Sequence, residues 1–400
     1  MTWLAAEPAR LAESVEPARK AASPAMGPLE RGPLERDPYG LRRIYYRDDG
    51  RVAPRVADLL ESPVRPDGLA VGALLAGQVF PGRSCAKGIR SVPPGQRLKA
   101  TSFGGWRAWS VPRLDPPASP TSAAHLERAL DRALRRARSG GGVALALSGG
   151  LDSALLLHLC RRQGLGGLLV TTLASGLAGY CELEDTERVA DAMGCDLHIV
   201  RVTAKDFVDA LPAAVRAAEV PFYNLHLVAF LLLARALRAQ GIRTLITGHG
   251  ADQALAHAPA SSTANFLPWI AALVESQGLR LCAPFVEAEV LAAIRRRGAD
   301  PTKTRLRRDF GAELPAFLTG ATKTPRLAPP LERLASPPDL EALWRREALE
   351  SWRADLLPFL RSRAWQRPLS AKHRTLLVSL SLLAYAWQST TARPGRHWGT

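Results

Sequence analysis

The 400-residue sequence has little cysteine and no long apolar run. Its five cysteines form no C-x-x-C pair: Cys85, Cys160, Cys181, Cys195 and Cys282. An odd number without such a pair argues against a disulfide framework or a zinc site and favours a reducing cytoplasm. The apolar runs fall short of the roughly 20 residues that a membrane span needs, and the glutamate-containing N-terminus is unlike a signal peptide. We expect a soluble cytoplasmic protein that does not engage a membrane.

Acidic residues are scarce relative to basic ones: 37 Asp and Glu stand against 53 Lys and Arg, a formal charge of +16. Such an excess suggests a polyanionic partner, such as a nucleotide, a nucleic acid or an acidic peptide. Most of it is arginine scattered among Ala, Leu, Gly and Pro, so it reflects either a bias in composition or a dedicated basic patch. A G-x-x-x-x-G-K-S/T motif is also missing, which excludes a Walker-type nucleotide site.

Three segments of the sequence differ in composition and in pattern. Residues 1–36 repeat "GPLER" and are rich in Ala, Pro and Glu, so we expect a partly disordered tail. In residues 37–118, "RRIYYRDDGRVA" predicts a hairpin with Asp49 and Gly50 in its turn, and "PPGQRLKA" and "GGWRAW" predict further strands. A proline-rich linker then leads to a larger unit over residues 119–400.

This larger unit alternates between strand and helix patterns. Leu126, Leu130 and Leu134 mark one helical face, and strand 143–147, helix 152–162 and later pairs follow up to strand 244–248. Alternation of this kind implies βαβ units and a doubly wound, mostly parallel sheet covered on both faces. Helical periodicity across residues 340–388 predicts a C-terminal helical lobe behind the site.

The stretch "SGGLDS" at 148–153 joins a buried strand to a helix. Ligands of doubly wound sheets bind beyond the carboxyl ends of the strands, where a helix N-terminus adds positive charge. Ser148, Gly149, Gly150 and Ser153 would supply donors for a phosphate or pyrophosphate. Asp152 would repel phosphate directly and is expected to bind Mg²⁺. The simpler alternative is a tight turn with a capping side chain.

This loop resembles the pyrophosphate loop of enzymes that split ATP into AMP and pyrophosphate. Four other stretches, "LITGHGADQA", "APFVEAEV", "KTRLRRDFGAELPAFLTGATK" and "RDPYGLRRIYY" with "VPPGQRL", resemble asparagine synthetase-like proteins, a group that includes β-lactam synthetases and lasso-peptide cyclases. The resemblance implies an α/β fold of the adenine nucleotide α-hydrolase-like, PP-loop type over 119–400. It also implies a smaller, mainly β, truncated Ntn-type (glutaminase-like) domain over 37–118, with ATP and Mg²⁺ as cofactors.

The resemblance also assigns roles to single residues. Gly248 and Gly250 would contact the nucleotide, Asp252 would be the second Mg²⁺ ligand, and Lys323 would stabilise the adenylate or tetrahedral intermediate unless it is a solvated loop residue. Lys303 and Arg307 would either bind pyrophosphate or cap a helix.

His249 stands where the family usually has glutamate. A neutral imidazole can accept the proton of an attacking ammonium group at physiological pH, so we expect a general base, the alternative being a turn residue packed near the adenine. Four further residues match positions that face the substrate in the family: Glu182, Glu219, Asn224 and His226. Each could equally be a surface residue or a residue that supports the site. His158 and His257 are weaker candidates.

One departure from the family bears on the nucleophile. Family glutaminases place a cysteine directly after the initiator Met, whereas this sequence reads Met-Thr-Trp and its first cysteine is Cys85. We therefore expect an amine of the substrate itself, rather than ammonia from glutamine, to attack the adenylated carboxylate.

Together with His249, this favours lasso-peptide-type macrolactam cyclisation of a precursor peptide, with a leader-processing protease as a further partner. The nearest alternative is a small-ring lactam synthetase. An RNA-modifying ATP pyrophosphatase fits the charge but not the glutaminase-like segment, so a nucleic-acid partner is not expected. A catalytically inactive scaffold is the third alternative, against which Asp152, Asp252 and Lys323 argue.

Overall fold

The computed structural model describes residues 34–76, 78–100, 106–110, 122–138, 140–164, 166–177, 179–222, 225–258, 266–320, 331–360 and 371–392. Its centre is a five-stranded parallel sheet in the order β11-β10-β7-β8-β9. The strands are β7 (Gly142–Ala146), β8 (Leu169–Ala174), β9 (His198–Arg201), β10 (Ile242–Thr247) and β11 (Arg280–Cys282). The chain winds outward from β7 to β9 and then returns to β10, so the direction of winding reverses between β7 and β10. The expected doubly wound α/β fold is confirmed.

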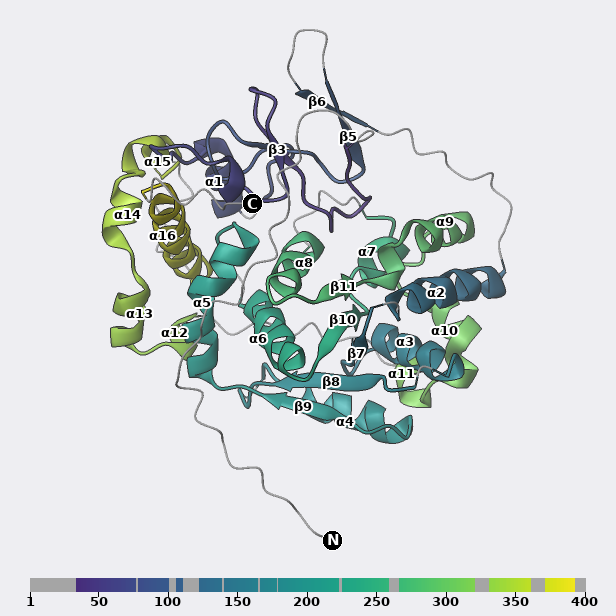
Figure 1. The fold of residues 1–400 in the computed structure, drawn as a ribbon. Coiled ribbons are helices and arrows are strands. Elements are labelled where there is room, and N and C mark those ends of the chain that lie inside the picture. Colours follow the sequence, from purple (N-terminus) through teal and green to yellow (C-terminus); the bar gives the residue numbers. More distant parts are fainter. Residues whose placement is uncertain are drawn as a thin grey trace.

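Helices cover both faces of this sheet (Figure 1). One group comprises α2 (Ala123–Ala137), α3 (Leu151–Arg162) and α9 (Ala288–Arg297), and the other α5 (Ala204–Ala218), α6 (His226–Ala239) and α8 (Leu267–Glu275). A further helix, α4 (Leu183–Ala192), packs beside β8. Leu126, Leu130 and Leu134 are all buried, as their spacing predicts. Almost every side chain of α3 is buried as well, because this helix lies against the central strands.

Two small antiparallel sheets precede the α/β unit. One has the order β1-β5-β6 and the other β3-β2-β4. Their strands are β1 (Leu34–Glu35), β2 (Tyr45–Tyr46), β3 (Val52–Ala53), β4 (Arg90–Ser91), β5 (Gln96–Ala100) and β6 (Trp106–Ser110). Asp67 caps α1 (Gly68–Leu75) by accepting hydrogen bonds from the backbone N–H groups of Leu69 and Ala70.

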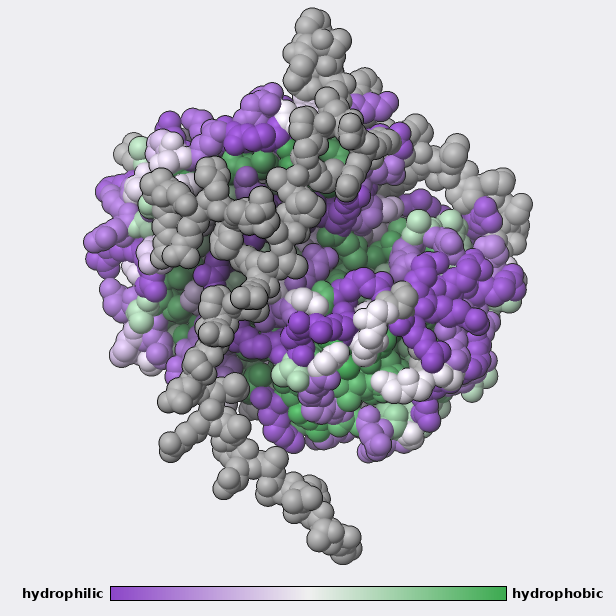
Figure 2. Space-filling view, viewed as in Figure 1, coloured by the Kyte–Doolittle hydropathy of each residue, from purple (hydrophilic) through white to green (hydrophobic). Residues whose placement is uncertain are grey.

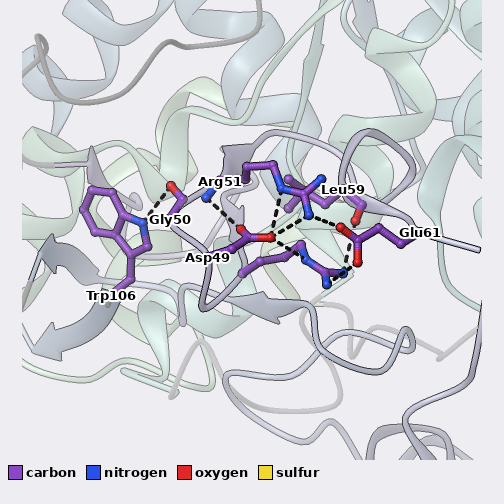
Figure 3. Close-up of polar contacts among 7 residues, drawn as sticks. Asp49, Gly50, Arg51, Leu59, Glu61 and Trp106 are labelled. Atoms are coloured by element: carbon purple, nitrogen blue, oxygen red, sulfur yellow. Dashed lines mark hydrogen bonds and ion pairs between the residues drawn. The ribbon is translucent and has the colours of Figure 1, made fainter. Parts of the chain in front are cut away.

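The expected hairpin joins β2 to β3, and Gly50 turns it with a φ of +92° (Figure 3). The Asp49 carboxylate accepts hydrogen bonds from Arg47 and Arg51, and both guanidinium groups also contact Glu61. The bond from Arg51 lowers the pKa of Asp49 to about 2. The Trp106 indole N–H donates to the Gly50 carbonyl at 2.8 Å, which ties this turn to β6.

The C-terminal region is helical, as its periodicity predicts. Its helices are α12 (Leu331–Leu334), α13 (Pro337–Leu343), α14 (Arg346–Glu350), α15 (Arg353–Leu360) and α16 (Ala371–Thr391). The helix α16 packs on α5 and α15 packs on α1. The buried Trp352 donates to the Val64 carbonyl at 3.0 Å, and Arg65 pairs with Asp355 at 2.5 Å. These helices therefore support the N-terminal region as well as α5. None of the helices in the described part of the chain is long and apolar enough to cross a bilayer.

Hydrophilic residues cover the surface over α2 and α9 (Figure 2). Two arginines of α2 are paired there with acidic residues around the start of α9. Arg132 binds Glu289 at 2.7 Å, and Arg136 contacts Glu287 and Glu289. On this face the excess of arginine is thus partly neutralised by neighbouring carboxylates.

Candidate active site

The loop after β7 is shaped by one of its own hydroxyl groups. Ser153 Oγ accepts a hydrogen bond from the Ser148 backbone N–H at 3.1 Å and lies 3.0 Å and 3.1 Å from the carbonyl oxygens of Ser148 and Gly150. Ser153 is buried, whereas 148–150 are half-buried. The hydroxyl of Ser153 therefore closes the loop, and the backbone of 148–150 is the part placed to meet a phosphate.

Glycines allow this loop to touch its neighbours through the backbone. A Cβ on Gly149 would lie 2.3 Å from the Cβ of Asp185 on α4, and one on Gly248 would lie 3.1 Å from the Cβ of Asp152. Gly250 has a φ of +91°, and its Cβ would lie 2.5 Å from Val286 Cγ1. Any larger residue at these positions would push apart the loop after β7, helix α4 and the turn after β10.

Two carboxylates and one ammonium group converge beside this loop. Lys303 Nζ lies 2.6 Å from Asp152 Oδ2 and 2.5 Å from Asp252 Oδ1. Asp152 is in the first turn of α3, Asp252 in the first turn of α7 (Ala251–Leu255), and Lys303 immediately precedes α10 (Thr304–Phe310). Burial alone would lower the pKa of Lys303, but the two carboxylates outweigh it and raise the pKa, so Lys303 is an ammonium ion.

A tight turn holds Lys303 in this place. Its φ of +59° is a left-handed conformation that is unfavourable for a residue with a side chain. Asp300 stabilises the turn, because its Oδ2 accepts the backbone N–H groups of Arg305 at 3.0 Å and Leu306 at 3.1 Å. The Asp300 N–H donates to the Leu255 carbonyl at 2.7 Å, which connects the turn to α7. Asp300 was not expected from the sequence, although an aspartate shortly before a helix is a capping signal.

His249 lies in the turn after β10 and is held on three sides. Its Nδ1 is 2.8 Å from Thr247 Oγ1, its ring meets the Phe230 ring edge-on at 4.9 Å, and it stacks on His226 at 6.0 Å. His249 is half-buried and His226 is exposed. With Nδ1 bonded to Thr247, proton transfer at this ring would fall to Nε2. Neither Thr247 nor Phe230 was foreseen from the sequence.

The donor set near the loop suits Mg²⁺. This ion prefers oxygen ligands and is commonly held by one or two carboxylates together with substrate phosphates. Asp152 and Asp252 supply two carboxylates that contact the same ammonium group. Within the described ranges, no cluster of three or more His, Cys, Asp or Glu side chains could hold a metal by itself. The pair would thus supply two of the oxygen ligands that such an ion needs.

The other expected site residues are dispersed. Arg307 lies on α10 with its guanidinium against the Thr302 carbonyl of its own turn. Glu182 directly precedes α4 and is half-buried, His158 is half-buried within α3, and His257 is exposed after α7 with a φ of +54°. Lys323 and Asn224 lie outside the described residues.

Glu219 does not face a substrate; it is a supporting residue, which is the other role that the sequence left open. Its side chain is 0% exposed, and its two carboxylate oxygens accept the backbone N–H groups of Val56 at 2.9 Å and Ala57 at 2.8 Å. Arg43 at 3.5 Å and Arg55 at 3.9 Å supply opposite charge. Burial raises the pKa of Glu219, against the opposing effect of Arg43. Glu219 thus joins the end of α5 to the N-terminal region.

The most buried cysteines are poor nucleophiles. Burial raises the pKa values of Cys85, Cys160 and Cys282 to about 12 each. Because the thiolate is the reactive form, these three residues are unsuited to attack on glutamine.

Comparison with known proteins gives one matching family and several distant relatives. The family model described as asparagine synthase matches residues 125–372. The chain is 31% identical over 141 residues to amidase chry2 of Gibberella zeae, covering 32% of this chain and 21% of the relative. It is 26% identical over 244 residues to amidase chyE of Penicillium rubens (54% and 36%) and 25% identical over 180 residues to a glutamine-hydrolysing asparagine synthetase of Brassica oleracea (41% and 30%). The matches thus span about a third or less of the length of these curated relatives.

Among solved structures, an NH₃-dependent NAD synthetase of Campylobacter jejuni aligns with 62% of this chain and 91% of its own, at 15% identity and a TM-score of 0.28. So low a score supports no structural assignment. The family model, in contrast, spans well over half of the sequence, including the loop after β7, the turn after β10 and Lys303. The chain belongs to the asparagine synthase family.

Proposed function

We propose that this protein forms an amide bond with ATP. A substrate carboxylate attacks the α-phosphate, pyrophosphate leaves, and an amine of the same substrate attacks the acyl adenylate and displaces AMP. Within this class we propose lasso-peptide-type macrolactam cyclisation, in which an Asp or Glu side chain of a precursor peptide is joined to its N-terminal amine. A protease that removes the leader would then act on the same precursor.

The observation that carries the proposal is the convergence of Lys303, Asp152 and Asp252 beside the glycine loop. The loop backbone and the N-terminus of α3 would bind phosphate oxygens. Asp152 and Asp252 would hold Mg²⁺, and the bound ion would offset negative charge on the departing pyrophosphate. The Lys303 ammonium would lie against the same phosphates once the carboxylates engage the ion.

His249 is our candidate for the proton acceptor in the second step. It lies in the turn that carries Asp252, and Thr247 and Phe230 fix its ring. An amine must lose a proton as it attacks the adenylate, and a neutral imidazole beside the acyl carbon would take that proton. The high pKa values of Cys85, Cys160 and Cys282 support an amine carried by the substrate rather than one released from glutamine.

The test is to incubate the full chain with ATP, Mg²⁺ and peptides that carry a free N-terminal amine and an internal Asp or Glu. We expect AMP and pyrophosphate in equal amounts and a peptide product that has lost one water. The same peptide with an acetylated N-terminus should still release pyrophosphate but should not cyclise. Release of ADP and phosphate instead of AMP would contradict the adenylation step.

Further substrates tested in the same assay separate the alternative functions. Pyrophosphate release with small amino-carboxylates but not with peptides would favour a small-ring lactam synthetase. Release that depends on tRNA and falls steeply with salt would favour RNA modification. Added glutamine should be neither hydrolysed nor needed.

A further inference from the structure

A cavity of about 820 Å³ lies between the N-terminal region and the β11 edge of the sheet. Its walls come from residues between 34 and 54 on one side and from α8, β11 and the start of α9 on the other. The volume is in the range of small-molecule sites, and such sites favour the interface between two structural units. None of its lining residues belongs to the 148–153 loop, the 247–252 turn or the 300–303 turn.

Much of the lining is apolar, including Leu41, Ile44, Leu281 and Ala283. Val286 also lines the cavity and packs against Gly250, so one wall of the cavity borders the turn that carries His249. A molecule that filled this space would therefore lie next to the candidate active site.

Most charged groups of the lining are already engaged. The Asp37 carboxylate accepts three backbone N–H groups, those of residues 39, 41 and 42. Glu287 and Glu289 are paired with arginines of α2. Arg43 binds Glu219, and Arg280 donates to carbonyl oxygens at the end of α2.

Glu275 is different. It is the last residue of α8 and an exposed residue of the cavity lining, and its carboxylate makes no hydrogen bond or ion pair with the part of the chain that the structure describes. The partly negative C-terminus of α8, whose last turn has no basic residue, adds to the charge of its carboxylate. Partial burial raises the pKa of Glu275, with Arg43 opposing this effect and Asp37 adding to it. A cationic group in the cavity would replace part of the solvation that burial removes from this carboxylate.

We propose that the cavity is a second binding site, which takes a cationic side chain with an apolar neighbour and uses Glu275 as the counter-ion. The apolar walls would bind the neighbour, and the carboxylate would form charge-assisted hydrogen bonds with an ammonium or guanidinium group. The ligand is a basic residue of the substrate peptide, held apart from the carboxylate that reacts. That last identification rests on the proposed function, whereas binding of an organic cation does not.

The test uses three dipeptide amides on the full chain without ATP: acetyl-Leu-Arg, its neutral isostere acetyl-Leu-citrulline, and acetyl-Leu-Glu. Calorimetric titration should show the arginine peptide binding ~10-fold more tightly than the citrulline peptide, because a charge-assisted hydrogen bond is roughly twice as strong as a neutral one. Glu275→Gln should remove that preference. Glu289→Gln, which changes a lining carboxylate that is already paired, should keep it.

A filling variant gives a second line of evidence. Ala288 is exposed at the start of α9 and lines the cavity, so Ala288→Trp should narrow it without disturbing the core, and all binding should weaken. The proposal would be overturned by equal affinities for the arginine and citrulline peptides, or by an unchanged preference in Glu275→Gln. It would also be overturned if the glutamate peptide bound more tightly than the arginine peptide, with Arg42 as its partner.

The proposal and the proposed function can fail separately. Asp152→Asn should abolish pyrophosphate release but leave binding of the arginine peptide unchanged. Glu275→Gln should raise the KM for a substrate peptide that contains a basic residue, with little change in kcat. For the variant of that peptide in which citrulline replaces the basic residue, KM should be the same in both proteins.

Discussion

Two buried charge clusters of this molecule are built alike and differ in what surrounds them. Each centres on a residue in the left-handed conformation at a helix end: Lys303 before α10 and Glu219 after α5, both with a φ of +59°. Lys303 lies between two carboxylates, and Glu219 lies between two guanidinium groups.

The difference lies in the remaining contacts. Both oxygens of Glu219 are occupied by backbone N–H groups, and its side chain is 0% exposed. In the other cluster, the side chain of Asp252 is 55% exposed, so that cluster opens to solvent on one side. A closed cluster can only hold two parts of the chain together, whereas an open one can exchange a partner for a ligand. Burial of charge alone therefore does not mark a functional site.

The largest effect is expected at the open cluster. Asp152→Asn should leave the fold intact, because the side chains are nearly isosteric and Lys303 keeps its contact with Asp252. It should abolish substrate-dependent formation of AMP and pyrophosphate, since one of two Mg²⁺ ligands loses its charge. Pyrophosphate release is the measurement, and Asp191→Asn on the exposed side of α4 is the matched control. Normal release by the Asp152 variant would remove the metal-ligand assignment.

The next effect concerns His249, beside the same cluster. His249→Ala should spare adenylation and slow amide formation by about 10²–10⁴-fold, the usual contribution of a general base. The activated intermediate or its hydrolysis product should accumulate while pyrophosphate still appears, and the variant should lose the decline in rate that an imidazole base causes at acidic pH. His257→Asn, a change that tolerates the positive φ of that residue, should have no effect. Parallel loss of both steps would instead assign His249 to nucleotide binding.

The closed cluster should respond in stability rather than in chemistry. Glu219→Ala leaves the buried N–H groups of Val56 and Ala57 without an acceptor and should lower the free energy of unfolding by about 3 kcal/mol. Glu219→Gln keeps one acceptor and should cost about 1 kcal/mol. Arg55→Ala is the control, because Arg55 is 39% exposed and its contact at 3.9 Å should be worth less than about 1 kcal/mol. Denaturant unfolding measures all three, and equal stability of the Ala variant and the parent would contradict this role.

The smallest effect is a pH dependence. Burial raises the pKa of Glu219, so the folded chain binds this proton more tightly than the unfolded chain. The protonated Glu219 carboxyl group therefore contributes its full stability to the fold below the ordinary glutamate pKa. This contribution is lost as pH rises through the pKa that Glu219 has in the folded chain. The difference in unfolding free energy between the parent and Glu219→Gln should shift against the parent as pH rises from about 4 to about 7. A shift in the opposite direction would mean that Arg43 and the backbone N–H groups outweigh burial.

Local patterns in the sequence predicted most of the α/β unit. The strand that ends before Ser148, the helix that follows it and the spacing of Leu126, Leu130 and Leu134 all depend on neighbours in sequence, so they can be read without the fold. The hairpin at Asp49 and Gly50 was predicted for the same reason.

Contacts between distant residues could not be predicted in this way. Lys303 and Asp152 are 151 positions apart, and nothing local to Lys303 distinguishes an active-site ammonium from a helix cap. Glu219 was a candidate for substrate contact or for a supporting role, and only the fold shows that the backbone of 56–57 binds its carboxylate. The cavity beside Glu275 could not be predicted either, because its two walls come from separate parts of the chain.

The glycine contacts of the site bear on how it can move. A Cβ on Gly149 would collide with Asp185, and a Cβ on Gly248 would lie tightly against Asp152. The loop after β7 therefore packs closely against the turn after β10 and the first turn of α4, and a shift of one segment would displace its neighbours. The side chain with room to rotate here is that of Asp252, which is 55% exposed, whereas the buried Lys303 is held between two carboxylates. Rotation of the Asp252 side chain would uncover the Lys303 ammonium on one side without moving the backbone.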